Sequence, residues 1–251
     1  MQEQAMEQAL FDWSGIGRFL DFSSRKFVLV NSKDNPELLW RILNDGRFPS
    51  ASEVFTHELS LSRAWFWQKT RADIRKYYFT QAENFEKLIL PYQELAGKKD
   101  LRIWLGHPLF ENGKLYNAYS LVDKNGIVFT QQKKFLYRTE RWLFDEPEKW
   151  GGNFGNYSIL ICSEASAFYS PLAWSGPTRI PELREARPPV VVVAAHWVKN
   201  KDYLKRTVQV IARKYIKKEV SGYVYEKGVR PEGCLVFVVN SGECYVVGPY
   251  E

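Results

Sequence analysis

A cysteine directly follows an apolar run in the segment YSILICSEAS, residues 157–166. Cys162 either packs as a small apolar group or acts as a nucleophile at the end of a strand. A nucleophilic thiol needs a base and an electropositive setting to reach its thiolate form. The base can be one of three histidines, His57, His107 or His196. It can also be a glutamate, assisted by a lysine that stabilises the thiolate and the oxyanion formed by its attack. These residues alone leave both arrangements open.

The lysine of such a site can be Lys133 or Lys134, which end a strand pattern. Alternate side chains of a strand share one face, so Lys133 lies on the face of Ile127, Phe129 and Gln131. This face carries the two larger apolar side chains and is the one expected to point inward. We therefore expect Lys133 at the site, with Lys134 as the alternative. A lysine at a strand end can also be a solvated residue that protects the edge of a sheet.

In their order, these segments resemble the carbon-nitrogen hydrolase (nitrilase) superfamily. The family pattern has a tyrosine-asparagine strand, an acidic-glycine turn, and a strand that ends in lysine, two residues and leucine. An apolar strand follows that ends in isoleucine-cysteine, one residue and an acid. The segments YNAYSLVDKNGIVFTQQKKFL and SILICSEASAFYSPLA follow this pattern, and the resemblance covers roughly residues 100–200. No single element is specific, but the ordered set is informative.

The resemblance implies that Cys162 is the nucleophile and that the backbone N–H of Ser163 joins Lys133 in an oxyanion hole. It also implies a glutamate base at the end of the second strand, usually after a proline. The segment RFPSASEVFTHE offers Glu53 and Glu58. We expect Glu53, because its setting EVFT resembles the family's loop, and keep Glu58 as the alternative.

Further residues are expected to bind substrate by the same resemblance. The family's second glutamate follows the lysine by several residues, and Glu140 in LYRTERW is the candidate. Glu140 can equally form a surface pair with Arg138 or Arg141. His196 and Trp197 end the next apolar strand, where family members have substrate contacts, and His196 can equally be a histidine at the edge of the core.

The implied activity is that of a thiol hydrolase of the amidase or nitrilase type. It would cleave a non-peptide C–N bond of a small amide or nitrile through a cysteine acyl-enzyme, using Glu53, Lys133 and Cys162. It would need no metal and no organic cofactor. Two alternatives stay open, namely an N-acyltransferase with the same triad and a catalytically inactive nitrilase-like scaffold that binds a partner.

The elements that must position these residues alternate between strand and helix, which predicts an α/β domain. The hairpin signal Asn125-Gly126 joins two of the strands. Strands are expected at 26–30, 50–55, 101–106, 114–123, 126–135, 157–162, 188–197, 234–240 and 244–248, and helices at 35–43, within 60–97 with a stop at Gly97, and within 202–220. The resemblance implies a nitrilase-like α-β-β-α sandwich of two mixed β-sheets covered by helices. Because family members commonly pair sheet to sheet into four-layered dimers, we also expect a homo-oligomer.

We assign residues 1–251 to a single domain, in which 1–25 have no clear element. The net charge is +6, but Lys and Arg are interleaved with acids, and RKYIKKE at 213–219 reads as a solvated helix face. We therefore do not expect nucleic-acid binding. The odd number of cysteines indicates a reducing compartment, and a Cys234–Cys244 disulfide has no support. No apolar stretch approaches the length of a membrane helix, so we expect a soluble, cytoplasmic protein.

Overall fold

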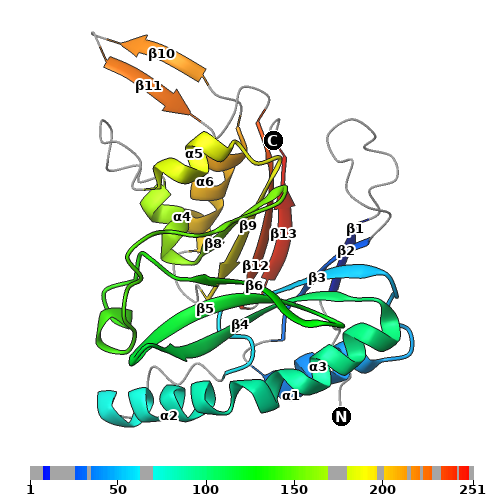
Figure 1. The fold of residues 1–251 in the computed structure, drawn as a ribbon. Coiled ribbons are helices and arrows are strands. Elements are labelled where there is room, and N and C mark those ends of the chain that lie inside the picture. The colour runs from blue at the N-terminus through cyan, green and yellow to red at the C-terminus, as the bar shows by residue number, and fades with distance from the viewer. Residues whose placement is uncertain are drawn as a thin grey trace.

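A computed structural model describes residues 8–11, 26–32, 35–62, 70–168, 180–196, 201–213, 216–220, 223–227, 233–241 and 243–248. Its strands form two mixed sheets that face each other, and helices cover the outer face of each sheet (Figure 1). The expected α/β sandwich is thereby confirmed. All four layers, α-β-β-α, come from one chain, so no second copy is needed to complete them.

The first sheet contains six strands in the spatial order β1 to β6. The strands are β1 (Gln8–Phe11), β2 (Lys26–Val30), β3 (Ser52–Thr56), β4 (Arg102–Glu111), β5 (Lys114–Asp123) and β6 (Gly126–Gln132). Strands β2, β3 and β4 are parallel, and the other pairings are antiparallel. The predicted hairpin joins β5 to β6, and Gly126 has a φ of +111°, a conformation that glycine adopts readily.

The second sheet has the order β13-β12-β9-β8-β7. Its strands are β7 (Asn153–Phe154), β8 (Tyr157–Ile161), β9 (Val190–Ala195), β12 (Leu235–Asn240) and β13 (Glu243–Val247). The three central strands β8, β9 and β12 are parallel. They are apolar on both faces because both faces are covered. Strands β10 (Ile216–Val220) and β11 (Tyr223–Lys227) form a separate antiparallel pair.

The described helices are α1 (Pro36–Asn44), α2 (Arg71–Glu83), α3 (Phe85–Lys99), α4 (Ser163–Phe168), α5 (Pro181–Ala186) and α6 (Lys201–Ala212), with a 3-10 turn η1 (Glu140–Trp142). The predicted start of α1 is confirmed, because the Asn35 side chain accepts hydrogen bonds from the backbone N–H groups of Glu37 and Leu38.

Strand alternation divides the core into layers. In β2, Phe27 and Leu29 lie between the two sheets, whereas Val28 and Val30 contact the layer of α1 and α3. Between the sheets, aromatic side chains are stacked, including Phe55 on Trp104 with ring centroids 5.9 Å apart. Buried apolar side chains of this kind supply most of the free energy of folding. The two sheets are therefore held in a fixed relation, which matters because each contributes to the site.

Two predicted helix ends are wrong. Helix α3 continues through Gly97 to Lys99 and ends at Asp100, whose left-handed φ of +53° turns the chain. Helix α6 ends at Ala212, and residues 216–220 form β10. The apolar spacing of 202–215 fits a helix, but β-branched residues at 216 and 220 pair with β11 instead. RKYIKKE is consequently not one helix face.

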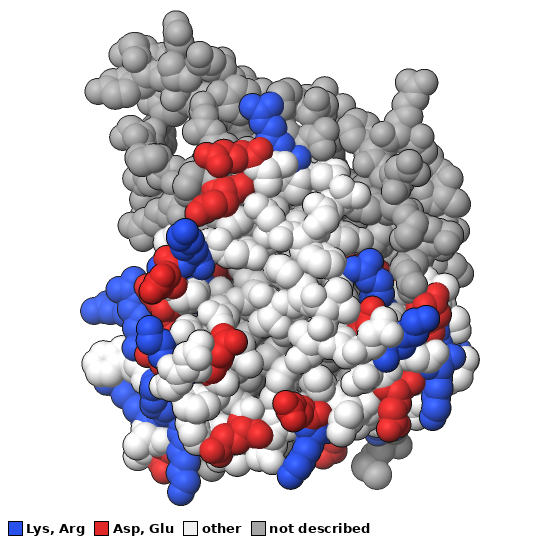
Figure 2. Space-filling model, in the orientation of Figure 1, with Lys and Arg blue, Asp and Glu red and all other residues white. Residues whose placement is uncertain are grey.

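The sequence analysis expected interleaved surface charges and found no support for a disulfide between Cys234 and Cys244. Lys and Arg side chains alternate with Asp and Glu around an uncharged centre on the face shown in Figure 2. Cys162, Cys234 and Cys244 form no disulfide in the part of the chain that the structure describes. Over the described ranges, no helix combines the length and the apolar character that crossing a bilayer requires.

Candidate active site

Three candidate functional side chains lie near one another just beyond the ends of strands from both sheets. Glu58 follows β3, and Lys133 follows β6, both in the first sheet. Cys162 follows β8 in the second sheet. All three side chains are buried, and that of Lys133 has 0% exposure. The fold thus gathers an acid, an ammonium and a thiol from distant parts of the sequence.

Lys133 lies between two carboxylates. Its Nζ donates to Glu58 Oε1 at 2.6 Å and to Glu140 Oε1 and Oε2 at 2.7 and 2.8 Å. Asn117 Nδ2 donates to the same two side chains, at 2.7 Å to Glu58 Oε1 and 3.1 Å to Glu140 Oε1. The backbone N–H of Tyr137 holds the other Glu140 oxygen at 2.6 Å. We call Glu58, Asn117, Lys133 and Glu140 the charged cluster.

The turn that carries Glu58 requires close contact between two backbones. Leu59 has a left-handed φ of +54°, which is uncommon outside glycine. The turn rests on Gly106 of β4, where an added Cβ would lie 2.3 Å from Leu59 N and 2.6 Å from His57 O. Ser60 Oγ accepts a hydrogen bond from Gly106 N at 3.0 Å. Only glycine at position 106 lets the turn approach this strand.

The turn that carries Cys162 is also strained. Cys162 has a φ of +52° between β8 and α4, and a left-handed non-glycine residue costs on the order of 1 kcal/mol. Its backbone N–H donates to Ala194 O at 2.8 Å, and its carbonyl accepts from Ala165 N at 3.1 Å. These bonds hold the conformation. Such strain is concentrated at functional sites in proteins.

The charges around Cys162 determine its protonation. Burial and the negative charge of Glu58 raise the pKa of the Cys162 thiol well above its usual value, although the Lys133 charge and a hydrogen bond from the His196 backbone oppose this. The thiol is therefore protonated at neutral pH, and it would have to lose its proton to act as a nucleophile. A base has to lie within reach of it.

Glu58 has the properties of that base. Burial opposes its ionisation, but the charge and hydrogen bond of Lys133, the proximity of His196 and a hydrogen bond with the Cys162 thiol outweigh burial and lower the pKa of Glu58. Burial raises the pKa of Glu140, because it outweighs the attraction of Lys133. Burial alone would lower the pKa of Lys133, but the charges of Glu140 and Glu58 raise it, so the ammonium stays charged.

One expectation for the site changes with this geometry. Glu53 lies within β3, where Oε1 accepts from Trp104 Nε1 at 2.8 Å and Oε2 lies 3.3 Å from Arg102 Nη1. Glu53 therefore contacts Trp104, which packs between the two sheets, and Arg102. Glu58, the alternative, contacts Lys133. The reason is that Glu58 follows the end of the strand, as Lys133 and Cys162 do.

Lys134, the alternative lysine, points elsewhere. Its Nζ donates to Pro147 O, and its backbone N–H donates to Glu164 Oε1 at 2.6 Å. The inward position expected for Lys133 from strand alternation is the observed one.

The structure brings the predicted substrate-binding residues to the same region, as far as it describes them. Glu140 belongs to the charged cluster rather than to a surface pair with an arginine. Ser163 is the first residue of α4, where backbone N–H groups have no partner within the helix. The His196 ring lies 6.4 Å from that of His57. Trp197 lies outside the described residues.

Two residues of the quoted sequence pattern, Asn117 and Glu164, were given no role by sequence reasoning. Asn117 is a polar side chain inside the buried strand β5, and that pattern alone marks it as a residue with specific partners. Glu164 is buried beside the turn of Cys162 and accepts from Lys134 N at 2.6 Å, Ile161 N at 2.8 Å and Gln131 Nε2 at 2.8 Å. Burial raises the pKa of Glu164 to about 7 despite these donors.

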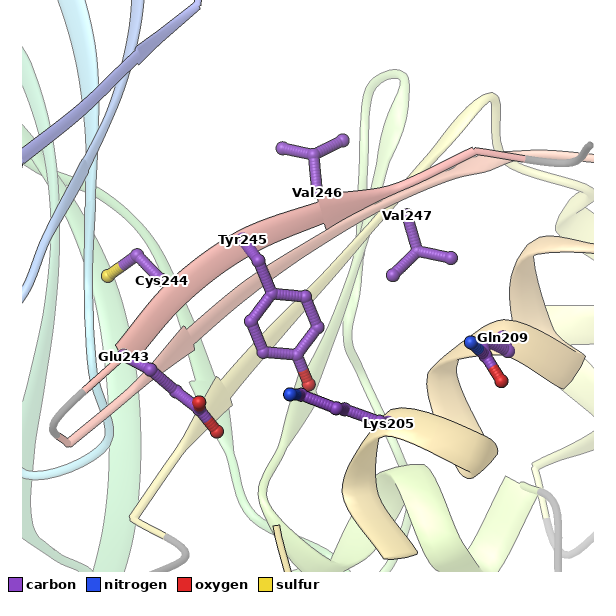
Figure 3. Close-up of a pocket in the computed structure, with 7 residues that line it drawn as sticks. All are labelled: Lys205, Gln209, Glu243, Cys244, Tyr245, Val246 and Val247. Carbon is purple, nitrogen blue, oxygen red and sulfur yellow. The ribbon is translucent and has the colours of Figure 1, made fainter. Parts of the chain in front are cut away.

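A separate pocket of about 360 Å³ lies between α6 and β13. Figure 3 shows Tyr245 and Lys205 directed toward each other across it. Its lining contains no member of the charged cluster. In the described part of the chain, no three His, Cys, Asp or Glu side chains are arranged to hold a metal ion.

No protein-family model and no curated protein matches the sequence. Solved structures with the same fold do exist. An amidase of the nitrilase superfamily from Nesterenkonia AN1 superposes with a TM-score of 0.60 at 16% identity, over 90% of this chain and 83% of the amidase. A carbon-nitrogen hydrolase from Helicobacter pylori G27 gives a TM-score of 0.54 at 12% identity, over 85% of this chain and 75% of that one.

The fold also occurs in a larger enzyme. The glutamine-dependent NAD⁺ synthetase from Acinetobacter baumannii gives a TM-score of 0.55 at 16% identity, over 88% of this chain but 41% of the synthetase. A variant of the Nesterenkonia amidase, with a TM-score of 0.56, carries the product of Michael addition of acrylamide at its active-site cysteine. At these identities the likeness establishes the nitrilase fold, which confirms the expectation from sequence.

Proposed function

We propose that this protein cleaves a C–N bond of a small amide or nitrile through a covalent intermediate on Cys162, with Glu58 as the base. One observation carries the proposal. A buried Lys133 is held at 2.6 Å from the Glu58 carboxylate, and the charges of both groups act on the buried Cys162 thiol. A fold shared with amidases and a carbon-nitrogen hydrolase supports the reaction class.

The steps for an amide follow from the contacts. Glu58 accepts the thiol proton while Cys162 Sγ forms a bond to the amide carbon, and the electron pair of the C=O bond moves to oxygen. Lys133 Nζ and the Ser163 N–H stabilise this oxyanion. The oxyanion then re-forms its C=O bond, the C–N bond breaks, and the leaving nitrogen takes the proton from Glu58. A thioester remains on Cys162.

The second half of the reaction releases the acid. Glu58 accepts a proton from water, the hydroxyl attacks the thioester carbon, and the C–S bond breaks as Sγ regains the proton. Glu140 keeps Lys133 in place, since it supplies two of the three acceptors of the ammonium. We also propose a substrate contact for His196, whose charge acts on Glu58 and whose backbone hydrogen-bonds to Cys162.

Covalent labelling tests the proposal. The protein is incubated with acrylamide, and the labelled fraction of each cysteine is measured by peptide mass spectrometry. We expect Cys162 to react much faster than Cys234 and Cys244, and this advantage to disappear in Glu58→Gln. Glu53→Gln is the matched control, because Glu53 is a buried glutamate that contacts Trp104 and Arg102 instead.

Ammonia release from a panel of small aliphatic amides tests turnover itself. A protein that labels all three thiols at equal, slow rates, and releases no ammonia, would be the inactive scaffold instead. Transfer of the acyl group to an added amine in preference to water would indicate the acyltransferase. The homo-oligomer and the cytoplasmic location stay predictions, and sedimentation of the purified chain tests the first.

A further inference from the structure

His57 directly precedes Glu58 and is completely buried. Its ring makes two hydrogen bonds at opposite sides. Nδ1 lies 2.8 Å from the backbone carbonyl oxygen of Glu58, and Nε2 lies 2.9 Å from Ser32 Oγ, just beyond β2. The ring therefore connects the turn that carries Glu58 to the neighbouring strand.

These two contacts determine the form of the ring. A backbone carbonyl can only accept, so Nδ1 must carry a hydrogen. In the neutral ring Nε2 is then an acceptor, and the Ser32 hydroxyl donates to it. No other arrangement of a neutral ring satisfies both partners.

The bond to the carbonyl fixes the peptide between Glu58 and Leu59. That peptide leads into the left-handed conformation of Leu59, which is unfavourable for a leucine. A buried carbonyl without a donor costs about 1–3 kcal/mol, so the imidazole favours this orientation over its alternatives. The same orientation directs the Glu58 carboxylate toward Lys133 Nζ and Asn117 Nδ2.

We propose that His57 is a positioning residue, which acts through its Nδ1–H on the Glu58 carbonyl to hold the carboxylate beside Cys162. It is not itself a base for the thiol, because its Nδ1–H is occupied by a carbonyl and its Nε2 by Ser32. The inference rests on the proposed function of Glu58, and the experiment separates the two.

The chain contains a matched control. His107 is another buried histidine, and its Nδ1 lies 2.9 Å from the carbonyl of the next residue, Pro108, while its Nε2 lies 2.8 Å from Ser120 Oγ. The pattern of contacts is the same. The ring of His107, however, is stacked on Phe85 of α3, with centroids 3.7 Å apart, in the helical layer.

The test uses two variants at position 57, each of which keeps one of the two hydrogen bonds of the His57 ring. Asparagine places an N–H donor near the former Nδ1, and glutamine places its amide near the former Nε2, toward Ser32. The rate of acrylamide addition to Cys162 is measured by mass spectrometry between about pH 6 and pH 9 for each folded variant.

We expect His57→Gln to slow addition by about 10- to 100-fold, the effect of misplacing a catalytic group by an ångström, and His57→Asn to restore most of the rate. His107→Gln should unfold at a lower urea concentration than wild type but keep the wild-type rate of acrylamide addition to Cys162. If His57→Gln fails to fold, His57→Phe replaces it, because phenylalanine keeps a ring but has no donor for the Glu58 carbonyl, and its rate should fall by a similar factor.

Three results would overturn the inference. One is an unchanged rate in His57→Gln or its substitute, another is an equal loss in the two variants at position 57, and the third is an equal loss in His107→Gln. An unchanged rate in Glu58→Gln would instead remove the proposed function, and with it the reason to position Glu58.

Discussion

Replacement of Lys133 by methionine tests whether the charged cluster is electrostatically coupled as its contacts indicate. Methionine is unbranched, apolar and of similar length, so it fills the space but removes the ammonium. Glu58 and Glu140 would then be two buried carboxylates with only neutral donors. Breaking a buried ion pair by removing one partner costs about 3–5 kcal/mol of folding stability.

The folding stability lost in Lys133→Met should depend on pH. The direction of this dependence follows from the pKa values of the two carboxyl groups. Without Lys133, burial and mutual repulsion raise at least one carboxyl pKa in the folded state above its value near 4.5 in the unfolded chain. A raised folded-state pKa contributes stability below the unfolded pKa, and this contribution is lost as pH rises through the folded pKa. The variant should therefore regain stability relative to wild type between pH 8 and pH 5, by about 1.4 kcal/mol for each pH unit that separates the folded-state from the unfolded-state pKa.

Urea unfolding followed by tryptophan fluorescence at pH 5 and pH 8 measures this difference, and the chain has 9 tryptophans to report it. Lys134→Met is the matched control, because the Nζ of Lys134 donates to the backbone carbonyl oxygen of Pro147 and not to the Glu58 or Glu140 carboxylate. Its stability difference from wild type should be small and equal at both pH values. A loss in Lys133→Met that is the same at pH 5 and pH 8 would refute the coupling.

Three further substitutions have defined outcomes, each measured by urea unfolding. Gly106→Ala places a Cβ within 3 Å of the backbone of the Glu58 turn and should cost about 1–3 kcal/mol while slowing Cys162 labelling; an unaffected protein would contradict the close approach. Glu164→Gln sets an NH₂ group against N–H donors and should cost about 2–3 kcal/mol at pH 8, whereas wild-type stability would show that these bonds are dispensable. Burial lowers the pKa of His107 to about 4, so its contribution to stability is lost as pH falls from 6.5 toward 4. The drop in stability from pH 7 to pH 5 should therefore be about 2 kcal/mol smaller in His107→Gln, and an equal drop would argue against a neutral buried ring.

Strand-end positions explain which parts of the site could be predicted from sequence. Lys133 was identified because alternation along a strand of seven residues is regular and places every second side chain inward. Cys162 was identified because it ends an unbroken apolar run. In both cases the local pattern determines the position of the side chain.

Glu58 was ranked below Glu53 for a physical reason. Its place depends on a turn in which Leu59 is left-handed, and leucine gives no sign of such a conformation in a sequence. The proline that usually precedes the family's glutamate is absent, and a histidine stands there. What stabilises this turn, namely Gly106 and Ser32, comes from other strands, so local reasoning could not find it.

The helix ends were missed for a related reason. The spacing of apolar residues continues past Ala212, but pairing between β10 and β11 replaces the helix there. Helix α3 likewise accommodates Gly97 because its own hydrogen bonds continue to the αL residue Asp100. Strand pairing overrides the helical pattern after α6, whereas the hydrogen bonds of α3 itself override the stop expected at Gly97.

The Glu164 carboxylate has a consequence for the whole sandwich. It accepts one backbone N–H next to Lys133, in the first sheet, and one next to Cys162, in the second. This single side chain therefore links the turn after β6 to the end of β8, at the point where Lys133 and Cys162 lie. Substitutions deep in the aromatic interior between the layers, remote from any bound molecule, should consequently alter the reactivity of the sulfur before they unfold the protein.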